Sequence, residues 1–532
     1  MPSVLFIAAV VIILCALLDI VSKRAGLPLL LIFILLGVVF GEDGLFGISF
    51  DDFQATEKLC EIALIFIMFY GGFGTNWKHA RPVAGKSILL STAGVVLTAG
   101  LTGLFCHLVL HLPWAEAFLT GSVVSSTDAA SVFSILRSRR LNLKDHTASL
   151  LEVESGSNDP AAYMLTMIFV ILAEGDITPA VIGGMVAAQI GFGMLCGVLA
   201  GIMAGYIAEK VQFEDAGFDI VFIVGMAVLA YSVSAAAGGN GYLAVYLCGI
   251  LLGNREIRGK KKLVHFFDGF TNLMQILLFF MLGLVAVPHS MPEVLAPALM
   301  IAVFLLLVAR PAVIFLLLAP LKCAPRQMLL ISFAGLRGAA SIVFAIMALT
   351  RSQLIGEIIF DVVFIIVLLS ILVQGTFLPA VARKLEMIDD SDDVMKTFTD
   401  YSDEKPVSFI RFTIPQGHPW SGMRIAEITL PPQTLVVLID REGTLKVPDG
   451  NTAVQEGDRI VLSARATGEI EGIQLSEVQL SGDSEYAGRP LSAYPVGNGA
   501  LVILIGRGRE TIIPKGSTVL QSGDLLVLNR VY

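Results

Sequence analysis

The sequence predicts a polytopic α-helical membrane protein with a smaller α+β tail at its C-terminal end. Of its 532 residues, 55% are hydrophobic and only 15% are charged, and the mean hydropathy is +0.79. Apolar runs that could cross a bilayer follow one another up to about residue 382. Beyond residue 385 the hydropathy falls, and two similar segments follow each other at an offset of 66 residues.

Thirteen apolar runs are predicted to span the membrane as helices. They lie at roughly 4–21, 27–41, 59–75, 87–111, 115–136, 147–173, 178–208, 218–238, 240–253, 267–287, 293–319, 327–350 and 357–382. The first run has no basic segment before it and no small-residue cleavage site after it. It therefore predicts a first span rather than a signal peptide.

Basic residues concentrate in alternate loops between these runs. Examples from one side are Lys78, Arg81, Lys86, Lys322, Arg326, Arg383 and Lys384. The opposite loops carry mainly acids, among them Glu42, Asp43, Asp52 and Glu174. By the positive-inside rule, the N-terminus is predicted outside and the C-terminal region in the cytoplasm. Such an arrangement requires an odd number of spans, which agrees with thirteen.

Composition disfavours several classes of function. The net charge is −9, but most of the acid surplus follows residue 385, and no basic cluster is interleaved with aromatic residues. The chain is therefore not expected to bind nucleic acid. The cysteines form no CxxC motif and have no histidine at ligand spacing; they are Cys15, Cys60, Cys106, Cys196, Cys248 and Cys323. We expect them to be packing residues, with neither a disulfide nor a metal site.

Two acidic residues lie inside predicted spans. Asp128 lies in the run 117–135, and Asp159 lies in the run 148–172. A charge at the bilayer centre costs roughly 2.5–3.5 kcal/mol even on the most lenient scale. Such an acid belongs to an ion or proton pathway, or it is neutralised by an arginine that holds helices together. For Asp159 the pathway is favoured, whereas for Asp128 both interpretations stay open.

Three further charges, Glu154, Arg310 and Arg337, also lie within apolar runs. Arg337 is flanked by Gly335 and Gly338, and glycine on both sides lets the backbone unwind and approach a neighbour closely. The spans thus hold three acids and two arginines. If the arginines neutralise two acids, one acid remains free to exchange a proton for a cation.

A faint internal repeat connects two of these charges. The segment 128–133, Asp-Ala-Ala-Ser-Val-Phe, resembles 338–344, Gly-Ala-Ala-Ser-Ile-Val-Phe, with one insertion. Corresponding interrupted helices in two halves are typical of inverted-repeat transporters. Unwound half-helices expose dipole ends, where an acid suits the N-terminal end and an arginine the C-terminal end.

Taken together, these motifs resemble a known family. Thr127-Asp128, the segment 154–159, Ala309-Arg310 and the segment 335–338 resemble the monovalent cation/proton antiporters of the NhaP and sodium/proton-exchanger branch. The resemblance covers about residues 1–385, in order and spacing. It implies a thirteen-helix fold with inverted repeats and two interrupted helices. It also implies a homodimer and an elevator-like movement of a core domain against a dimer domain.

The resemblance assigns roles to individual side chains. Asp159 would be the carboxylate that alternately holds a proton or a cation. Asn158 would mark the electroneutral branch, and Thr127 and Ser155 would add oxygen ligands. Monovalent hard cations need oxygen ligands, and a single carboxylate that must lose its proton before it takes a cation enforces exchange.

Two ion pairs are also implied. Glu154 would pair with Arg310, and Asp128 would pair with Arg337. The sequence departs from the family in two places: Ala129 stands where proline is common after Thr-Asp, and Tyr70 stands where the third span often ends in a carboxylate. Tyr70 is either a packing residue or part of the ion path, where it would alter selectivity or proton sensing.

The tail begins with an acidic linker, predicted at 386–403 after a transmembrane exchanger domain at 1–385. Two repeats follow, predicted at 404–465 and 470–532, in which Pro448 corresponds to Pro514 and the turn at Gly457-Asp458 to Gly523-Asp524. Short apolar stretches between Gly, Pro and Asp turns predict β-strands. The first repeat is similar to the C-terminal domain of regulators of potassium conductance, and the second would be a degenerate sister. That resemblance implies gating by a small-molecule regulator, often a small nucleotide.

The sequence therefore predicts a secondary antiporter that exchanges cytoplasmic K⁺ for external H⁺, is electroneutral, and is regulated by its tail. We place it in a bacterial inner membrane, with no cofactor beyond its transported ions. Na⁺ or Li⁺ exchange is the alternative within the class. A gated cation channel is disfavoured because no TVGYG-like filter occurs. An enzyme is disfavoured because no HExxH motif or protease signature occurs.

Overall fold

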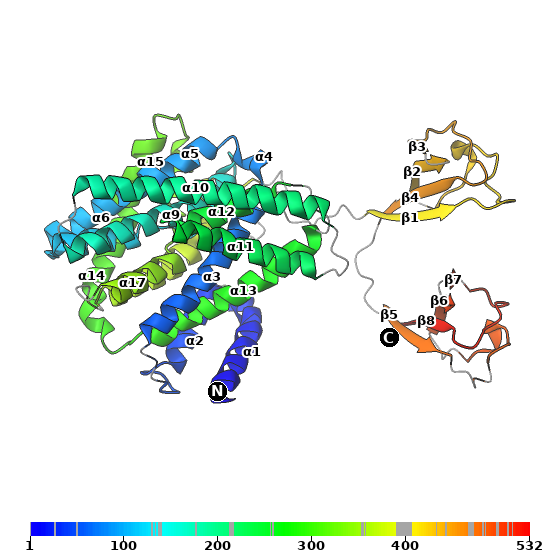
Figure 1. The fold of residues 1–532 in the computed structure, drawn as a ribbon, viewed down its shortest axis with the longest axis horizontal. Coiled ribbons are helices and arrows are strands. Elements are labelled where there is room, and N and C mark those ends of the chain that lie inside the picture. Colours follow the sequence, from blue (N-terminus) through cyan, green and yellow to red (C-terminus); the bar gives the residue numbers. More distant parts are fainter. Residues whose placement is uncertain are drawn as a thin grey trace. The chain divides into compact units, whose positions relative to one another are not determined.

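The computed structural model divides into two compact units, Met1–Ser402 and Asp403–Tyr532, each described here by itself (Figure 1). The structure describes the chain except for residues 1, 26–27, 49, 51, 129–130, 133–134, 137–140, 176–177, 212–216, 256, 258–259, 353–355, 357, 390–406, 432–433, 442–443, 466–472, 481–483, 485, 496–499, 508–509, 513 and 532. Ala129 and the acidic residues of the linker from 390 onward therefore lie outside the described residues.

The first unit consists of helices. Its first half contains α1 (Pro2–Ala25), α2 (Leu29–Phe40), α3 (Phe53–Gly74), α4 (Trp77–Ala80), α5 (Ala84–Leu89), the π-helical turn η1 (Leu90–Gly94), α6 (Val95–Leu110), α7 (Trp114–Val123) and α9 (Thr147–Glu174). Its second half contains α10 (Pro179–Lys210), α11 (Phe218–Ala236), α12 (Gly241–Gly253), α13 (Lys260–Val285), α14 (Met291–Phe304), η2 (Leu305–Ala309), α15 (Arg310–Leu318), α16 (Pro325–Phe333), α17 (Ala339–Arg351), α18 (Ile358–Ser370), η3 (Ile371–Gly375) and α19 (Thr376–Lys384).

Within the described residues, six continuous helices are long and apolar enough to cross a membrane. They are Ala84–Leu110, Pro179–Lys210, Phe218–Ala236, Lys262–Val285, Met291–Leu318 and Ile358–Lys384. Shorter apolar helices lie at Phe6–Leu18, Leu29–Phe40, Gly241–Gly253 and Ala339–Arg351. The helical membrane region confirms the predicted fold class, and the count of thirteen spans stays a prediction.

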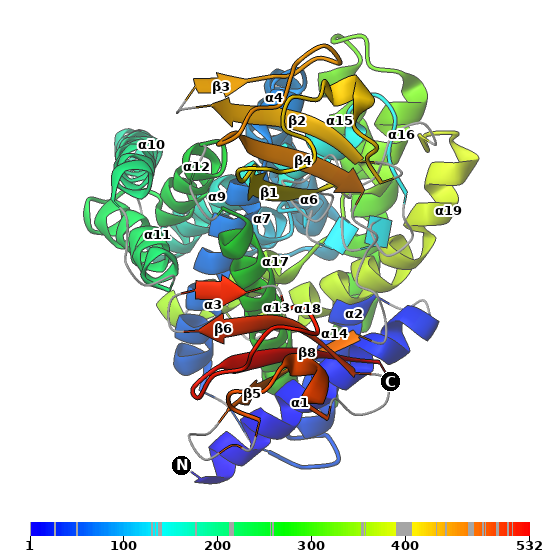
Figure 2. The ribbon, with the colours of Figure 1, turned by 90° about the vertical axis from the view of Figure 1, so that its right-hand side faces the viewer.

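The helices pack into two bundles. We call the first the α3 bundle, in which α3 packs on α12 and α13. Helices α10 and α11 of this bundle pack on α12, and helices α1 and α2 pack on α13. In the second, the α9 bundle, α9 packs on α5 and α7, α7 on α6, α14 on α18, and α17 on α18. Figure 2 shows α10, α11 and α12 on one side of this unit, α16 and α19 on the other, and α17 between them.

Glycine permits the close packing of the α3 bundle. A Cβ added at Gly72 of α3 would lie 2.3 Å from the Tyr246 carbonyl oxygen of α12, and one at Gly249 would lie 2.4 Å from the Phe69 carbonyl oxygen. Helices in membranes associate largely through such small residues, because lipid tails remove the hydrophobic advantage of burial. A side chain at either position would force α3 and α12 apart.

Two helices of the α9 bundle are interrupted. Helix α7 ends at Val123, and residues 125–128 are not helical; α16 ends at Phe333, and α17 starts only at Ala339. The two non-helical segments touch, since the amide nitrogen of Asp128 donates to the Leu336 carbonyl oxygen across 2.8 Å. The predicted pair of interrupted helices is thus confirmed.

The second unit contains two four-stranded antiparallel sheets. The first has the order β1 (Val407–Thr413), β4 (Arg459–Arg465), β2 (Thr434–Arg441), β3 (Thr444–Lys446), with the short 3₁₀ helix η5 (Ile425–Glu427). The second has the order β5 (Ile473–Gln479), β8 (Leu525–Val531), β6 (Ala500–Arg507), β7 (Glu510–Ile512), with η6 (Leu491–Ala493). The two sheets pair their strands in the same way, as the sequence repeat predicts. The β2–β4 register shifts between Val436 and Leu438, and the β6–β8 register shifts at the equivalent place, between Val502 and Leu504.

Each sheet, with its loops, forms one module that contains the same ion pair between a partly exposed arginine and a buried aspartate. In the first, Arg441 Nε and Nη2 donate to the two carboxylate oxygens of Asp458, both at 2.8 Å. In the second, Arg507 makes the same two bonds to Asp524. The glycine before each aspartate has a positive φ of 84° or 86°, a backbone conformation that glycine adopts without a steric penalty.

Candidate functional site

Asp159 lies near the middle of α9, on the side that faces the unwound segment after α7. The hydroxyl of Ser126 donates to Asp159 Oδ1. Pro160 follows directly and has no amide hydrogen, so one carbonyl of the preceding turn loses its helical partner. Asp159 is half-buried, whereas Ser126 is buried. A carboxylate, a hydroxyl and polar backbone therefore meet at one point inside the bundle.

Thr127 joins this point to the rest of α9. Asn158 Nδ2 donates to Thr127 Oγ1 at 2.5 Å, and Ser155 Oγ donates to the Thr127 carbonyl oxygen at 2.6 Å. Asn158 is 1% exposed, and its Oδ1 is a buried oxygen that accepts no hydrogen bond from the described part of the chain. The four residues Thr127, Ser155, Asn158 and Asp159 thus form one oxygen-rich cluster, which we call the Asp159 cluster.

Arg310 contacts α9 at Glu154, the residue directly before Ser155 of this cluster. Its Nη2 donates to Glu154 Oε1 at 2.5 Å, and the two side chains are 4% and 1% exposed. A Cβ added at Gly335 would lie 2.8 Å from Arg310 Nε, so glycine leaves room for the guanidinium beside the second interruption. Removing one partner of a buried pair leaves an uncompensated charge, so we infer that this contact stabilises the bundle.

Arg337 makes a different contact from the predicted one. Its Nη1 donates to the carbonyl oxygens of Ser125 and Ser126, each at 2.8 Å, and its amide nitrogen donates to Ser370 Oγ at 2.8 Å. Across the described residues, no hydrogen bond or ion pair joins it to Asp128. The carbonyls that follow α7 have no helical partner, and a cation stabilises that negative dipole end.

The described hydrogen bonds of the Asp128 side chain go to Ser131 instead. Its Oδ1 accepts from the Ser131 amide nitrogen at 3.2 Å, and the Ser131 hydroxyl donates to its Oδ2. A Cβ added at Gly338, the residue before α17, would lie 2.3 Å from Asp128 Cβ. The acid and the arginine therefore lie at the dipole ends expected for them, and the predicted side-chain pair is replaced by two separate backbone contacts.

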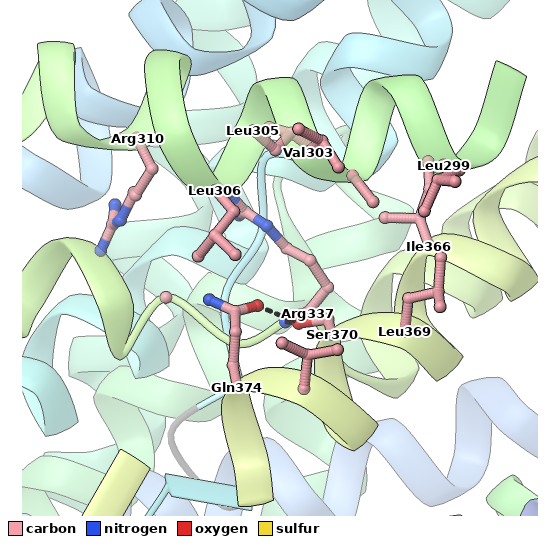
Figure 3. A pocket seen from close by; sticks show the side chains of 13 residues that line it. Leu299, Val303, Leu305, Leu306, Arg310, Arg337, Ile366, Leu369, Ser370 and Gln374 are labelled. Atoms are coloured by element: carbon pink, nitrogen blue, oxygen red, sulfur yellow. Dashed lines mark hydrogen bonds between the residues drawn. The ribbon is translucent and has the colours of Figure 1, made fainter. Parts of the chain in front are cut away.

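A pocket of about 120 Å³ lies beside the two arginines (Figure 3). Leu299 to Arg310 line one wall, Ile366 to Gln374 line the other, and Arg337 lies between them. Gln374 Nε2 donates to the carbonyl oxygen of Phe333, the last residue of α16, at 2.8 Å. Ser370 and Gln374 thus support the second interruption, although the sequence analysis missed them. Their signal is two polar residues one turn apart in an otherwise apolar run.

Tyr70 does not reach the Asp159 cluster through any described contact. Its hydroxyl donates to Asp268 Oδ1 of α13 at 3.4 Å, and its ring lies beside that of Phe267. Its suggested place on the ion path stays a prediction. Another tyrosine, Tyr246 of α12, contacts α9 instead: a Cβ added at Gly156 would lie 2.4 Å from its ring.

Comparison with known proteins identifies both parts of the chain. Residues 9–384 match the family described as sodium/hydrogen exchanger, transmembrane. Residues 409–470 and 475–528 each match the TrkA-C domain. The first match covers most of the first unit, and the second covers both β-sheet modules.

Named relatives are similar over most of their length. The K(+)/H(+) antiporter NhaP of Alkalimonas amylolytica is 34% identical over 447 residues, which are 83% of this chain and 78% of the relative. The K(+)/H(+) antiporter NhaP2 of Shewanella sp. (strain ANA-3) is 32% identical over 462 residues, 86% of this chain and 80% of the relative. The sodium proton antiporter MjNhaP1 from Methanocaldococcus jannaschii superposes with a TM-score of 0.63 at 23% identity, covering 72% of this chain and 99% of that structure, a likeness of fold.

Proposed function

This chain belongs to the sodium/hydrogen exchanger family, and from that premise we propose that it exchanges cytoplasmic K⁺ for external H⁺ at the Asp159 cluster. The observation that carries the proposal is the cluster itself. The Asp159 carboxylate accepts from the Ser126 hydroxyl, and the adjacent Asn158 donates to the Thr127 hydroxyl and has a buried oxygen without a described donor. Membership of this family implies a transporter rather than an enzyme.

Exchange follows from a single carboxylate with two competing occupants. When Asp159 is protonated, it has no charge to hold a cation. When it is ionised, its oxygens and those of Thr127 and Asn158 can replace part of a cation's hydration shell. Ser155 positions the Thr127 carbonyl, and Asn158 positions the Thr127 hydroxyl. Because neither occupant can bind with the other present, each crossing of the site carries one of them.

Electroneutral exchange is part of the same proposal. The neighbour of Asp159 is the neutral Asn158, and the nearby Glu154 is paired with Arg310. One carboxylate therefore changes its occupant in each cycle. A neutral cycle would swap one monovalent cation for one proton.

Potassium is favoured over sodium by two considerations. The two relatives quoted above at more than 30% identity are named K(+)/H(+) antiporters, and the tail contains two TrkA-C modules, which resemble the C-terminal domain of regulators of potassium conductance. Oxygen ligands alone do not separate K⁺ from Na⁺. Na⁺ or Li⁺ exchange is therefore the alternative that the transport experiment must test.

We further propose a homodimer in a bacterial inner membrane, with the N-terminus outside. The alternation of basic and acidic loops supports this orientation. The α3 bundle would form the dimer and stay in place while the α9 bundle moves. The tail would then lie in the cytoplasm, where a small ligand, such as a nucleotide, would regulate exchange.

Transport into inside-out vesicles tests the proposal. A pH gradient is established, K⁺, Na⁺, Li⁺ and Rb⁺ are added in turn, and collapse of the gradient is followed with a pH-sensitive dye. We expect K⁺ to collapse the gradient at the lowest concentration and expect a membrane potential to leave the rate unchanged. A response to Na⁺ alone would identify sodium, not potassium, as the exchanged cation. No response to any cation would reject the proposed antiport.

A further inference from the structure

We propose that a cluster of side chains between the two bundles, beyond Asp159 at the end of the first unit opposite Glu386 and Met387, is the outer gate of this antiporter. The cluster has a polar part, which we call the latch (Glu57, Thr350 and Arg351), and an aromatic part, which we call the plug (Tyr163, Tyr231, Tyr242 and Phe344). None of these residues carried a role in the sequence analysis. The inference rests on the proposed antiport, since a gate presupposes transport.

The latch joins the last residues of α17 to the first turns of α3. Thr350 Oγ1 donates to Glu57 Oε2 at 2.7 Å, and Arg351 Nε lies 3.5 Å from Glu57 Oε1. The side chain of Glu57 is 14% exposed and that of Arg351 is 40% exposed. Because Arg351 keeps partial access to solvent, its ion pair with Glu57 contributes less than a fully buried pair would, and the contact can break and form again. That property suits a gate better than a permanent brace.

The plug fills the space between the bundles next to the latch. Tyr163 of α9 meets Tyr242 of α12 edge to face, with ring centroids 5.2 Å apart, and both rings pack on Phe344 of α17 at 5.8 and 6.1 Å. Tyr231 of α11 packs on Tyr242 at 5.3 Å. Tyr242 is 1% exposed, so these rings leave no open passage where they meet.

The α3 bundle holds its half of the plug firmly. The hydroxyl of Tyr231 donates to Glu61 of α3, one turn after Glu57. Tyr231 and Tyr242 therefore stay with α3 and α12, whereas Tyr163 and Phe344 belong to α9 and α17. A displacement of one bundle against the other would separate the two halves of the plug and open the latch together.

Along α9, the plug lies on the C-terminal side of Asp159, the proposed exchange site. Tyr163 follows Asp159 by four residues, one helical turn, which corresponds to about 6 Å along the axis. Between them, Asn240 Nδ2 of the α3 bundle donates to the Pro160 carbonyl oxygen at 2.8 Å. On the proposed route, an ion that left Asp159 along α9 toward Glu174 would meet this contact first and the plug next.

The end of the bundle that carries the gate follows from chain connections. Glu386 and Met387, which lead toward the tail, contact Arg326 at the start of α16 and Lys144 just before α9. Both α9 and the interrupted helix α16–α17 run away from that end, toward Tyr163 and Arg351. With the tail in the cytoplasm, the latch and plug therefore face the outside.

Reversible cross-linking tests the gate. Glu57→Cys and Thr350→Cys would be combined and bridged in membranes by a short bifunctional thiosulfonate, because the distance between the side-chain ends suits a spacer better than a direct disulfide. The fraction bridged is read on gels without any transport assay. K⁺-driven collapse of a pH gradient is then measured before bridging, after bridging, and after reduction.

We expect bridging to reduce exchange to the background of empty vesicles and reduction to restore the starting rate. Wild type and each single cysteine variant, treated identically, control for the six native thiols, five of which are buried. A bridged protein that still exchanges at the unbridged rate would overturn the gate, as would a pair that fails to bridge. Bridging in a protein whose unmodified form moves no cation would leave the contact standing and reject the proposed antiport instead.

A second measurement uses the latch charges. Glu57→Gln and Arg351→Gln break the same contact, so both should change the apparent K⁺ affinity in the same direction, and the double variant should match the larger single effect. Glu293→Gln, in the first turn of α14 at the same end of the bundle, is the matched control that should leave this affinity unchanged. Additive effects of the two latch substitutions would contradict a shared contact.

Discussion

Asp128 and Leu336 are joined by a 2.8 Å hydrogen bond between backbone amide and carbonyl, at the point where both interrupted helices are unwound. The charged side chains around this contact serve the ends of half-helices. Arg337 holds two carbonyls that follow α7, and Asp128 accepts from the amide of Ser131. Within the described part of the chain, the crossing is therefore stabilised by hydrogen bonds between side chains and the backbone.

We expect Arg337→Gln to destabilise the protein by about 1.5–3 kcal/mol, the usual contribution of hydrogen bonds from a charged donor. Asp128→Asn should destabilise it independently, because its described bonds go to Ser131. Because the two side chains share no described hydrogen bond, the coupling energy between the two substitutions should be smaller than either single loss, although both lie at one crossing. Thermal unfolding of the two single variants and the double variant in detergent measures this coupling energy. If the double variant recovered most of the lost stability, the result would support a direct ion pair between Asp128 and Arg337.

Glu154 and Arg310 should behave in the opposite way. Either Glu154→Gln or Arg310→Gln leaves one buried charge without its partner, and we expect a loss of about 3–5 kcal/mol. Combining Glu154→Gln with Arg310→Met removes both charges and should recover part of that loss. The same unfolding measurement applies, and equal instability of the single and double variants would count against the pair.

Asp159→Asn should abolish cation/proton exchange, because the amide can neither release a proton nor supply a negative charge. The variant should still insert and assemble, since Ser126 can donate to the amide oxygen. Exchange in inside-out vesicles is the measurement, with size-exclusion chromatography as the check on folding. Glu174→Gln, at the exposed end of the same helix, is the control, and exchange retained by Asp159→Asn would show that another group carries the proton.

Removing the tail should leave an exchanger with altered regulation. We expect a chain that stops after Asp389 to exchange, because every residue of the Asp159 cluster precedes that point. Residues 387–389 should be kept: Leu143 and Ile388 form an antiparallel bridge, and the Lys144 amide nitrogen donates to the Met387 carbonyl oxygen at 2.9 Å. Exchange rate against pH, compared with the full chain at matched expression, measures the effect. An inserted but inactive truncation would make the tail part of the transport machinery.

The tail modules should lose stability only in strong acid. Hydrogen bonds from Arg441 hold the pKa of Asp458 below its usual value, and those from Arg507 do the same for Asp524. Because both pKa values are lowered on folding, the stabilisation is complete above the unfolded value, about 3.9, and is lost as pH falls through the folded values. Melting of the 403–532 fragment from pH 6 to pH 2 tests this. Asp458→Asn should flatten the part of the curve that belongs to the first module.

Sequence reasoning located the chemistry because ionisable residues in an apolar run are costly and therefore informative. It singled out Asp159 as a candidate exchange site, and the family resemblance that these residues carry implied the Glu154–Arg310 pair, which the structure contains. It also identified the tail repeat, and both copies match the TrkA-C domain, although the second was expected to be degenerate. The roles of the Asp159 cluster in transport remain predictions.

The sequence by itself determined the membrane fold class and the two helix interruptions, and it supplied the candidates for binding a cation or proton, which stay a prediction. Hydropathy, glycine and rare buried charges carry that information locally. Only the tertiary structure decided which groups the polar side chains bind. The described bonds of the Arg337 guanidinium go to the carbonyl oxygens after α7 and not to Asp128. Gln374 donates to the carbonyl oxygen of the last residue of α16. Glu57 meets Thr350 from almost three hundred residues away in the chain. Hydrogen-bond partners depend on distance and direction in space, and spacing along a sequence specifies neither when the chain returns through another helix.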